Sequence, residues 1–163
     1  MAFLEWLQNL GFSQWVNASS SLWAYPMFLF LHTLGMSLVA GGNAVIDLAL
    51  LGLWPKTPIK PLERMYPLLI GGFVLNAFTG VSMFMKDATT AGTNIDFYIK
   101  MVFVFAGFYL LLRMRRQVFR DPRLDQGPVW GGAKALAWAS LFCWFAAIVS
   151  GRLIAYVGPV AGV

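Results

Sequence analysis

The stretch that decides the fold is LWAYPMFLFLHTLGMSLVAGGNAVIDLALLGL, residues 22–53. It stays apolar for longer than the roughly 20 residues that a helix needs to cross a bilayer. It holds one carboxylate, Asp47, and the only histidine of the chain, His32. We therefore predict a transmembrane helix that carries a histidine. Because an imidazole at the depth of the lipid tails is costly and usually faces the protein interior, His32 is the first candidate for a functional residue.

The composition extends this prediction to the whole chain. Of the 163 residues, 59% are hydrophobic and 12% are charged, whereas a soluble domain has about 25% charged residues. Three further apolar stretches follow the first, so we predict an all-α integral membrane protein, a four-helix bundle in one domain. The four predicted transmembrane helices cover about residues 22–50, 65–86, 97–117 and 133–157 of the 1–163 domain.

The N-terminal segment is expected to lie on the membrane surface. Residues 1–16 mix apolar and polar side chains and contain Trp6 and Trp15, but they are too few to span a bilayer. We predict a short amphipathic helix at the lipid headgroups. The serines between Ala18 and Leu22 are expected to cap the first transmembrane helix.

The charged loops predict the orientation of the bundle. Nine of the 12 basic residues flank the first and third connections, namely Lys56, Lys60, Arg64, Arg113, Arg115, Arg116, Arg120, Arg123 and Lys134. By the positive-inside rule these connections are cytoplasmic, and both termini are periplasmic in a bacterial inner membrane. The net charge of +5 therefore reflects topology, not nucleic-acid binding. Asp47 is expected at the inner interface, paired with Arg64 or with the cluster Arg113–Arg116.

Three interpretations of His32 remain open, and one of them is proton or quinone chemistry at the imidazole. At about 1.5 Å per residue, His32 lies roughly 15 Å into the membrane, level with Asn76 of the second helix. His32 shares a helix face with Gly35 and Met36, so the glycines on both helices would allow close packing around a hydrogen-bonded structural histidine. Alternatively, the glycines leave a slot for a flat ring, and His32 ligates the metal at its centre.

Two basic residues near the outer end of the bundle have two interpretations. Lys100 and Arg152 either reach toward the lipid headgroups or bind the acidic part of a ligand, such as the propionates of haem. Asp96, four residues before Lys100, would satisfy its charge locally. In the second interpretation the predicted cofactor site consists of His32, Gly35, Met36, Asn76, Lys100 and Arg152, with His32 as the metal ligand.

Four segments carry a resemblance to known families: LHTLGMSLVAGG (31–42), IDLALLGL (46–53), GFVLNAFTGVSMFMKDAT (72–89) and FYIKMVFVFAGFYLLL (97–112). Together they resemble a bacterial inner-membrane family of four-helix proteins of unknown function, which implies the fold but no activity. His32 and Lys100 are also similar to a first-helix histidine and a later lysine of the small membrane protoporphyrinogen oxidases and the copper-resistance protein D group. The resemblance to the oxidases implies haem binding through His32.

The chain departs from those haem proteins in having no second histidine. A bis-histidine haem within one subunit is therefore excluded, and a sixth ligand must be a methionine, a lysine, a water or a residue of another chain.

These features favour a redox or cofactor-binding membrane protein that holds haem b and takes part in electron transfer. A non-catalytic accessory subunit of a larger membrane complex is the alternative, and copper handling through His32 and Met36 is a weaker one. The sequence contains no hydrolytic triad, P-loop or dinucleotide-binding motif, which disfavours a stand-alone hydrolase or nucleotide enzyme. Whether the protein is an enzyme stays open. The expected partners are the lipid bilayer and either other membrane subunits or a second copy of the chain.

Overall fold

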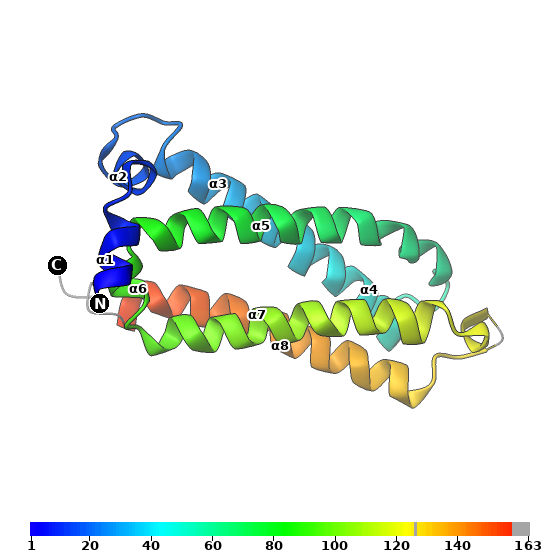
Figure 1. The fold of residues 1–163 in the computed structure, drawn as a ribbon. Helices are drawn as coiled ribbons and strands as arrows, with labels where there is room; N and C mark the ends of the chain where they lie inside the picture. The colour runs from blue at the N-terminus through cyan, green and yellow to red at the C-terminus, as the bar shows by residue number, and fades with distance from the viewer. Residues whose placement is uncertain (126, 158–163) are drawn as a thin grey trace.

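The structure is a computed structural model that describes residues 1–125 and 127–157. Four helices in it are long and apolar enough to cross a membrane, and they form an elongated bundle (Figure 1). The described residues contain no strand. The predicted all-α bundle of four transmembrane helices is thereby confirmed.

The first transmembrane segment is one continuous rod made of α3 (Tyr25–Met36), the π-helical turn η1 (Ser37–Gly41) and α4 (Gly42–Leu51). It begins at Tyr25, where Pro26 suits the first turn. The predicted serine cap is wrong, because the hydroxyl of Ser21 accepts from the backbone N–H of Trp23 at 3.2 Å and so belongs to the preceding turn. The segment ends at Gly52, whose φ of 91° lies in the left-handed region that favours glycine.

The other three transmembrane segments follow with short connections. They are built from η2 (Lys60–Met65) with α5 (Tyr66–Lys86), from α7 (Ile95–Met114) with the π-helical turn η3 (Arg115–Phe119), and from α8 (Gly131–Val157). The short helices α6 (Ala88–Ala91) and η4 (Pro122–Asp125) lie in the connections. The side chain of Asn94 caps α7 by accepting from the N–H of Asp96 at 2.8 Å. Helices α5 and α7 each cross the full bundle without a break (Figure 1).

Helix α3 packs along α5, α7 packs along α8, and α4 crosses behind α5 to reach α8 (Figure 1). The contact between α3 and α5 depends on glycine, because a Cβ atom at Gly35 would lie 2.8 Å from the backbone N of Asn76. A Cβ atom at Gly72 would likewise lie 2.7 Å from the Cβ of Leu38. Small residues at such positions let two helix backbones approach closely.

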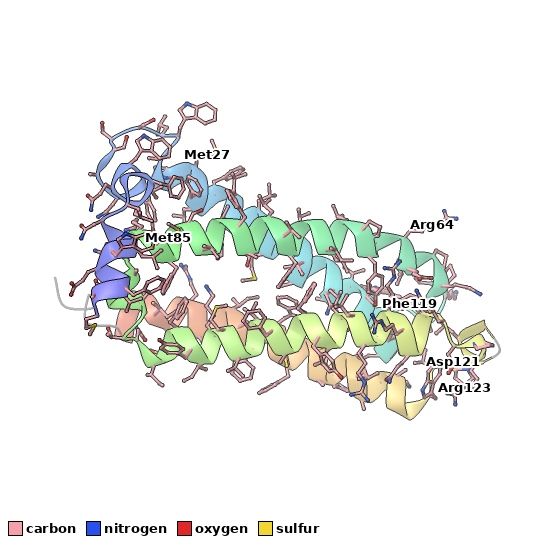
Figure 2. The ribbon with its side chains drawn as sticks, in the orientation of Figure 1. Met27, Arg64, Met85, Phe119, Asp121 and Arg123 are labelled. Atoms are coloured by element: carbon pink, nitrogen blue, oxygen red, sulfur yellow. The ribbon has the colours of Figure 1, made fainter. Side chains whose placement is uncertain are left out.

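The two ends of the bundle differ in chemistry. Helices α1 (Ala2–Gln8), α2 (Gly11–Ala18) and α6 lie together at one end, so the predicted interfacial segment forms two helices where one was expected (Figure 1). Gln8 ties this end together by accepting from the hydroxyl of Thr89 at 2.7 Å. Figure 2 shows Arg64, Asp121 and Arg123 at the opposite end, which we call the basic end. There Arg123 donates to Asp121 at 2.7 Å and lowers the pKa of that carboxyl.

Candidate functional site

The imidazole of His32 is fixed against α5. Its Nδ1 lies 3.1 Å from the carbonyl oxygen of Asn76 and 3.1 Å from the hydroxyl oxygen of Thr79. The carbonyl oxygen can only accept, and the Thr79 hydroxyl already donates to the carbonyl of Leu75 at 2.7 Å. The proton of a neutral His32 is therefore on Nδ1, and the lone pair is on Nε2. This is the arrangement that holds metal-ligating histidines in orientation.

The side chain of Asn76 makes a second link between α3 and α5. Its amide Nδ2 donates to the backbone carbonyl of His32 at 2.9 Å, and the residue is buried. The ring of His32 also meets Gly80, because a Cβ atom there would lie 3.1 Å from the Cε1 atom of the imidazole. Backbone, amide and hydroxyl groups of α5 thus fix the ring while α3 carries it.

Two cavities flank His32. The first, which we call the aromatic cavity, has a volume of about 290 Å³ and lies between α3, α5 and α7. The second, which we call the α3–α8 cavity, has a volume of about 720 Å³ and lies chiefly between α3 and α8. Among the residues that the structure describes, only His32 and Lys100 line both cavities. Pockets for small molecules usually have volumes of about 300–1,000 Å³, so both cavities are of a size to receive part or all of such a ligand.

Aromatic side chains form the walls of the aromatic cavity. Phe84 and Phe97 stack with their ring centroids 5.1 Å apart, and Phe73 and Phe108 stack with theirs 3.7 Å apart. Each pair joins α5 to α7, and three of the four rings line the cavity. Because the members of each pair are about three helical turns from those of the other pair, a gap remains between the two stacks. A flat apolar group would suit this gap.

Lys100 also lines the aromatic cavity, and its positive charge is not neutralised by a neighbouring group that the structure describes. The predicted ion pair with Asp96 does not form, and within residues 1–125 and 127–157 the Lys100 ammonium has no hydrogen-bonding or ionic partner. Its side chain crosses over α8, where a Cβ atom at Gly151 would lie 3.5 Å from Cε of Lys100. The charge of Lys100 also acts on His32. A half-buried ammonium without a counter-ion is costly in an apolar bundle, so the site favours an anionic group.

The structure brings most of the predicted site residues together. His32, Asn76 and Lys100 line the aromatic cavity, and Met36 and Arg152 line the α3–α8 cavity with His32 and Lys100. Gly35 lines neither, because it packs against the backbone of α5. The predicted slot between the glycines is therefore wrong: the glycines close the seam between α3 and α5, and the open space lies on both sides of it.

Sequence reasoning missed the aromatic walls. The signal was present, because Phe73 and Phe84 on α5, and Phe97 and Phe108 on α7, recur after about three helical turns and so share one face of each helix. An apolar chain with 14 phenylalanines gives no reason to select these four before the two helices are known to be neighbours.

The prediction for Asp47 is wrong. Asp47 is fully buried, and its Oδ2 accepts from Nδ2 of Asn43 at 2.7 Å. The arginines are elsewhere: Arg64 is exposed, and Arg115 lies with its Nε 3.5 Å from Oε1 of Glu63. The physical reason is that α4 crosses to α8, which turns the face of Asn43 and Asp47 into the bundle and away from the loops.

Comparison of the chain with protein-family models, with curated proteins and with solved structures finds no match. The site must therefore be interpreted from its geometry. Across the part of the chain that the structure describes, no three His, Cys, Asp or Glu side chains gather as a metal site. A metal at His32 would take its other ligands from a ring or from thioethers.

Proposed function

We propose that this membrane protein binds haem b, or a similar flat ring with acidic groups, at His32 and serves as a redox-active component of the membrane. The observation that carries the proposal is the hydrogen bond from Nδ1 of His32 to the carbonyl of Asn76 at 3.1 Å. It leaves the lone pair of the ring on Nε2, which has Nδ2 of Asn76 at 3.5 Å, in a site where the ammonium of Lys100 has no partner among the described residues.

The residues present suit such a group. Aromatic and aliphatic walls match the apolar faces of the ring, and Lys100 and Arg152 offer positive charge for its carboxylates. Met101 lines the aromatic cavity, and Met36 and Met83 line the α3–α8 cavity, so a thioether is available for a sixth position. When bound, haem would supply one-electron redox chemistry, and the protein would supply its orientation and its electrostatic environment.

Copper handling is a second candidate with an observation of its own. Met36 and Met83 line the α3–α8 cavity together with His32. Two thioethers and an imidazole are ligands that suit Cu(I). This candidate does not use the charge of Lys100, which would repel a cation.

We also propose that the protein lies in a bacterial inner membrane with its basic end in the cytoplasm and both termini in the periplasm. The nine basic residues of the first and third connections support this orientation. The exposed tryptophans of the opposite end, Trp6, Trp15 and Trp23, fit an interfacial aromatic belt.

Purification of the full chain in detergent separates these candidates. The haem proposal predicts a Soret absorption band in the preparation and the band's loss in His32→Gln, which keeps a side-chain hydrogen-bond donor. The copper candidate predicts a colourless protein with one copper per chain in elemental analysis, lost when His32 and Met36 are replaced together. A colourless and metal-free protein that copurifies with a larger membrane assembly would favour the accessory subunit.

A further inference from the structure

A second buried polar group lies in the inner half of the bundle. Asn43 and Asp47 of α4 and Ser140 of α8 each have 0% exposure. Nδ2 of Asn43 donates to Oδ2 of Asp47 at 2.7 Å and to Oγ of Ser140 at 2.6 Å. We call these three residues the Asn43 cluster. It joins α4 to α8, and it is separate from the two cavities beside His32.

If Asp47 is ionised, the Asn43 cluster has more buried hydrogen-bond acceptors than donors. Asn43 has used both amide hydrogens, and its Oδ1 has no hydrogen-bond partner. Oδ1 of Asp47 has none either. With an ionised Asp47 both atoms are acceptors that lack a donor. Buried acceptors of this kind are rare in native proteins, and each one calls for an explanation.

The surroundings of Asp47 provide no compensating charge. From α5, Tyr66 faces it with a fully buried hydroxyl that has no hydrogen-bond partner. Arg115 of η3 lies over the ring of Tyr66, with its guanidinium carbon 5.3 Å from the ring centroid, and is held by Glu63 of η2. From α8, the neutral hydroxyl of Ser140 hydrogen-bonds to the Asp47 carboxyl. An ionised carboxylate that is buried without a cation is strongly disfavoured.

We infer that Asp47 carries a proton at neutral pH and that the Asn43 cluster is a proton-binding site in the membrane. The reaction is the binding of one proton by the carboxylate to give the carboxylic acid, with no electron transferred. Protonation removes the negative charge from the apolar interior. Ionisable residues held inside transmembrane bundles commonly mark proton relays.

Tyr66 borders the charged groups of the basic end. Arg115 of η3 lies over its ring, with the guanidinium carbon 5.3 Å from the ring centroid, and pairs with Glu63 of η2. The π-helical turn η1 ends two residues before Asn43, and η3 begins at Arg115. Turns of this kind are frequent at functional sites. The inference concerns α4 and α8 and does not depend on a cofactor at His32.

Infrared spectroscopy of the full chain in lipid tests the inference. At pH 7 we expect the carbonyl-stretch absorption of a protonated carboxylic acid, sensitive to H₂O/D₂O exchange, that is lost in Asp47→Asn and kept in the matched control Asp96→Asn. Because the amide is neutral and of the same shape, Asp47→Asn should keep the helical circular dichroism of the wild type. If that variant does not fold, Asn43→Ala carries the test, since the band should shift when the acid loses its donor.

Three results would overturn the inference. One is a wild-type spectrum at pH 7 with ionised carboxylates only. Another is an acid band that persists unchanged in a folded Asp47→Asn variant and in Asn43→Ala. The third is a band that appears in choline buffer and disappears when sodium is added, which would assign the Asn43 cluster to a metal cation.

Discussion

His32 and Lys100 stand on different helices, α3 and α7, and border the same two cavities. One side chain offers a lone pair on Nε2, and the other offers a positive charge without a partner among the described residues. A ligand that fills either cavity therefore meets both groups. The proposed haem site depends on this pairing of an imidazole with an unpaired positive charge.

Lys100→Met should lower the affinity for haem by about 10- to 100-fold, because a hydrogen bond to a charged group contributes about 1.5–3 kcal/mol. Titration of the purified variant with haem measures this change. Lys86→Met is the matched control, since Lys86 is engaged with Asp87 at 2.9 Å and lines neither cavity. Equal losses in the two variants would show that Lys100 has no special part in binding.

Gly80→Ala should displace the imidazole, because a Cβ atom at that position would lie 3.1 Å from Cε1 of His32. Overpacking of this kind costs about 1–3 kcal/mol, so we expect haem affinity to fall by about tenfold. Gly71→Ala lies on the same helix with nothing within 4 Å of its new Cβ atom. Binding curves for these two variants should differ, and identical curves would contradict the position given to His32.

Gly35→Ala should weaken the bundle itself, since the added Cβ atom meets the backbone of α5 at 2.8 Å and backbone cannot move aside as a side chain can. We expect a loss of about 1–3 kcal/mol in the free energy of unfolding. Unfolding in detergent, followed by circular dichroism, provides the measurement. A variant as stable as Gly41→Ala, whose new Cβ atom has nothing within 4 Å, would refute the close approach of α3 and α5.

The orientation can be tested with single cysteines placed at the two ends in a Cys143→Ser background. A cysteine at Thr93, which is exposed near the α1 end, should react with a membrane-impermeant maleimide applied from the periplasmic side. A cysteine at Lys56, exposed at the basic end, should react only after the membrane is opened. The reverse pattern would invert the proposed topology.

The fold was predictable because it depends on quantities that the sequence holds directly. Apolar length and charge density set the four transmembrane segments, and the membrane leaves helices as the only way to satisfy their backbone hydrogen bonds. The level of His32 with Asn76 followed from the helical rise, and the structure shows these residues bonded. Local detail at the ends was less accessible: the serine cap failed because Ser19 and Ser21 bond within their own turn.

The contacts and burial of residues that lie where two helices cross were not predictable. Asp47 was expected near the loops, but the crossing of α4 toward α8 buries it beside Asn43 and Ser140. The four stacked phenylalanines can be identified as cavity walls only once α5 and α7 are known to be neighbours. Gly35 was assigned to an open slot, whereas its lack of a side chain brings two backbones together. A sequence shows which side chains share a helix face, but not which helix that face meets.

The measurement that tests the central claim most directly is a haem titration of the purified full chain, with the Soret band compared between the wild type and His32→Gln. The claim that Nε2 of His32 ligates the iron predicts saturation at one haem per chain in the wild type and no saturable band in the variant. Phe30→Leu is the folded control, because Phe30 is an exposed residue of α3 that lines neither cavity. Equal, saturable binding by the wild type and His32→Gln would contradict the claim.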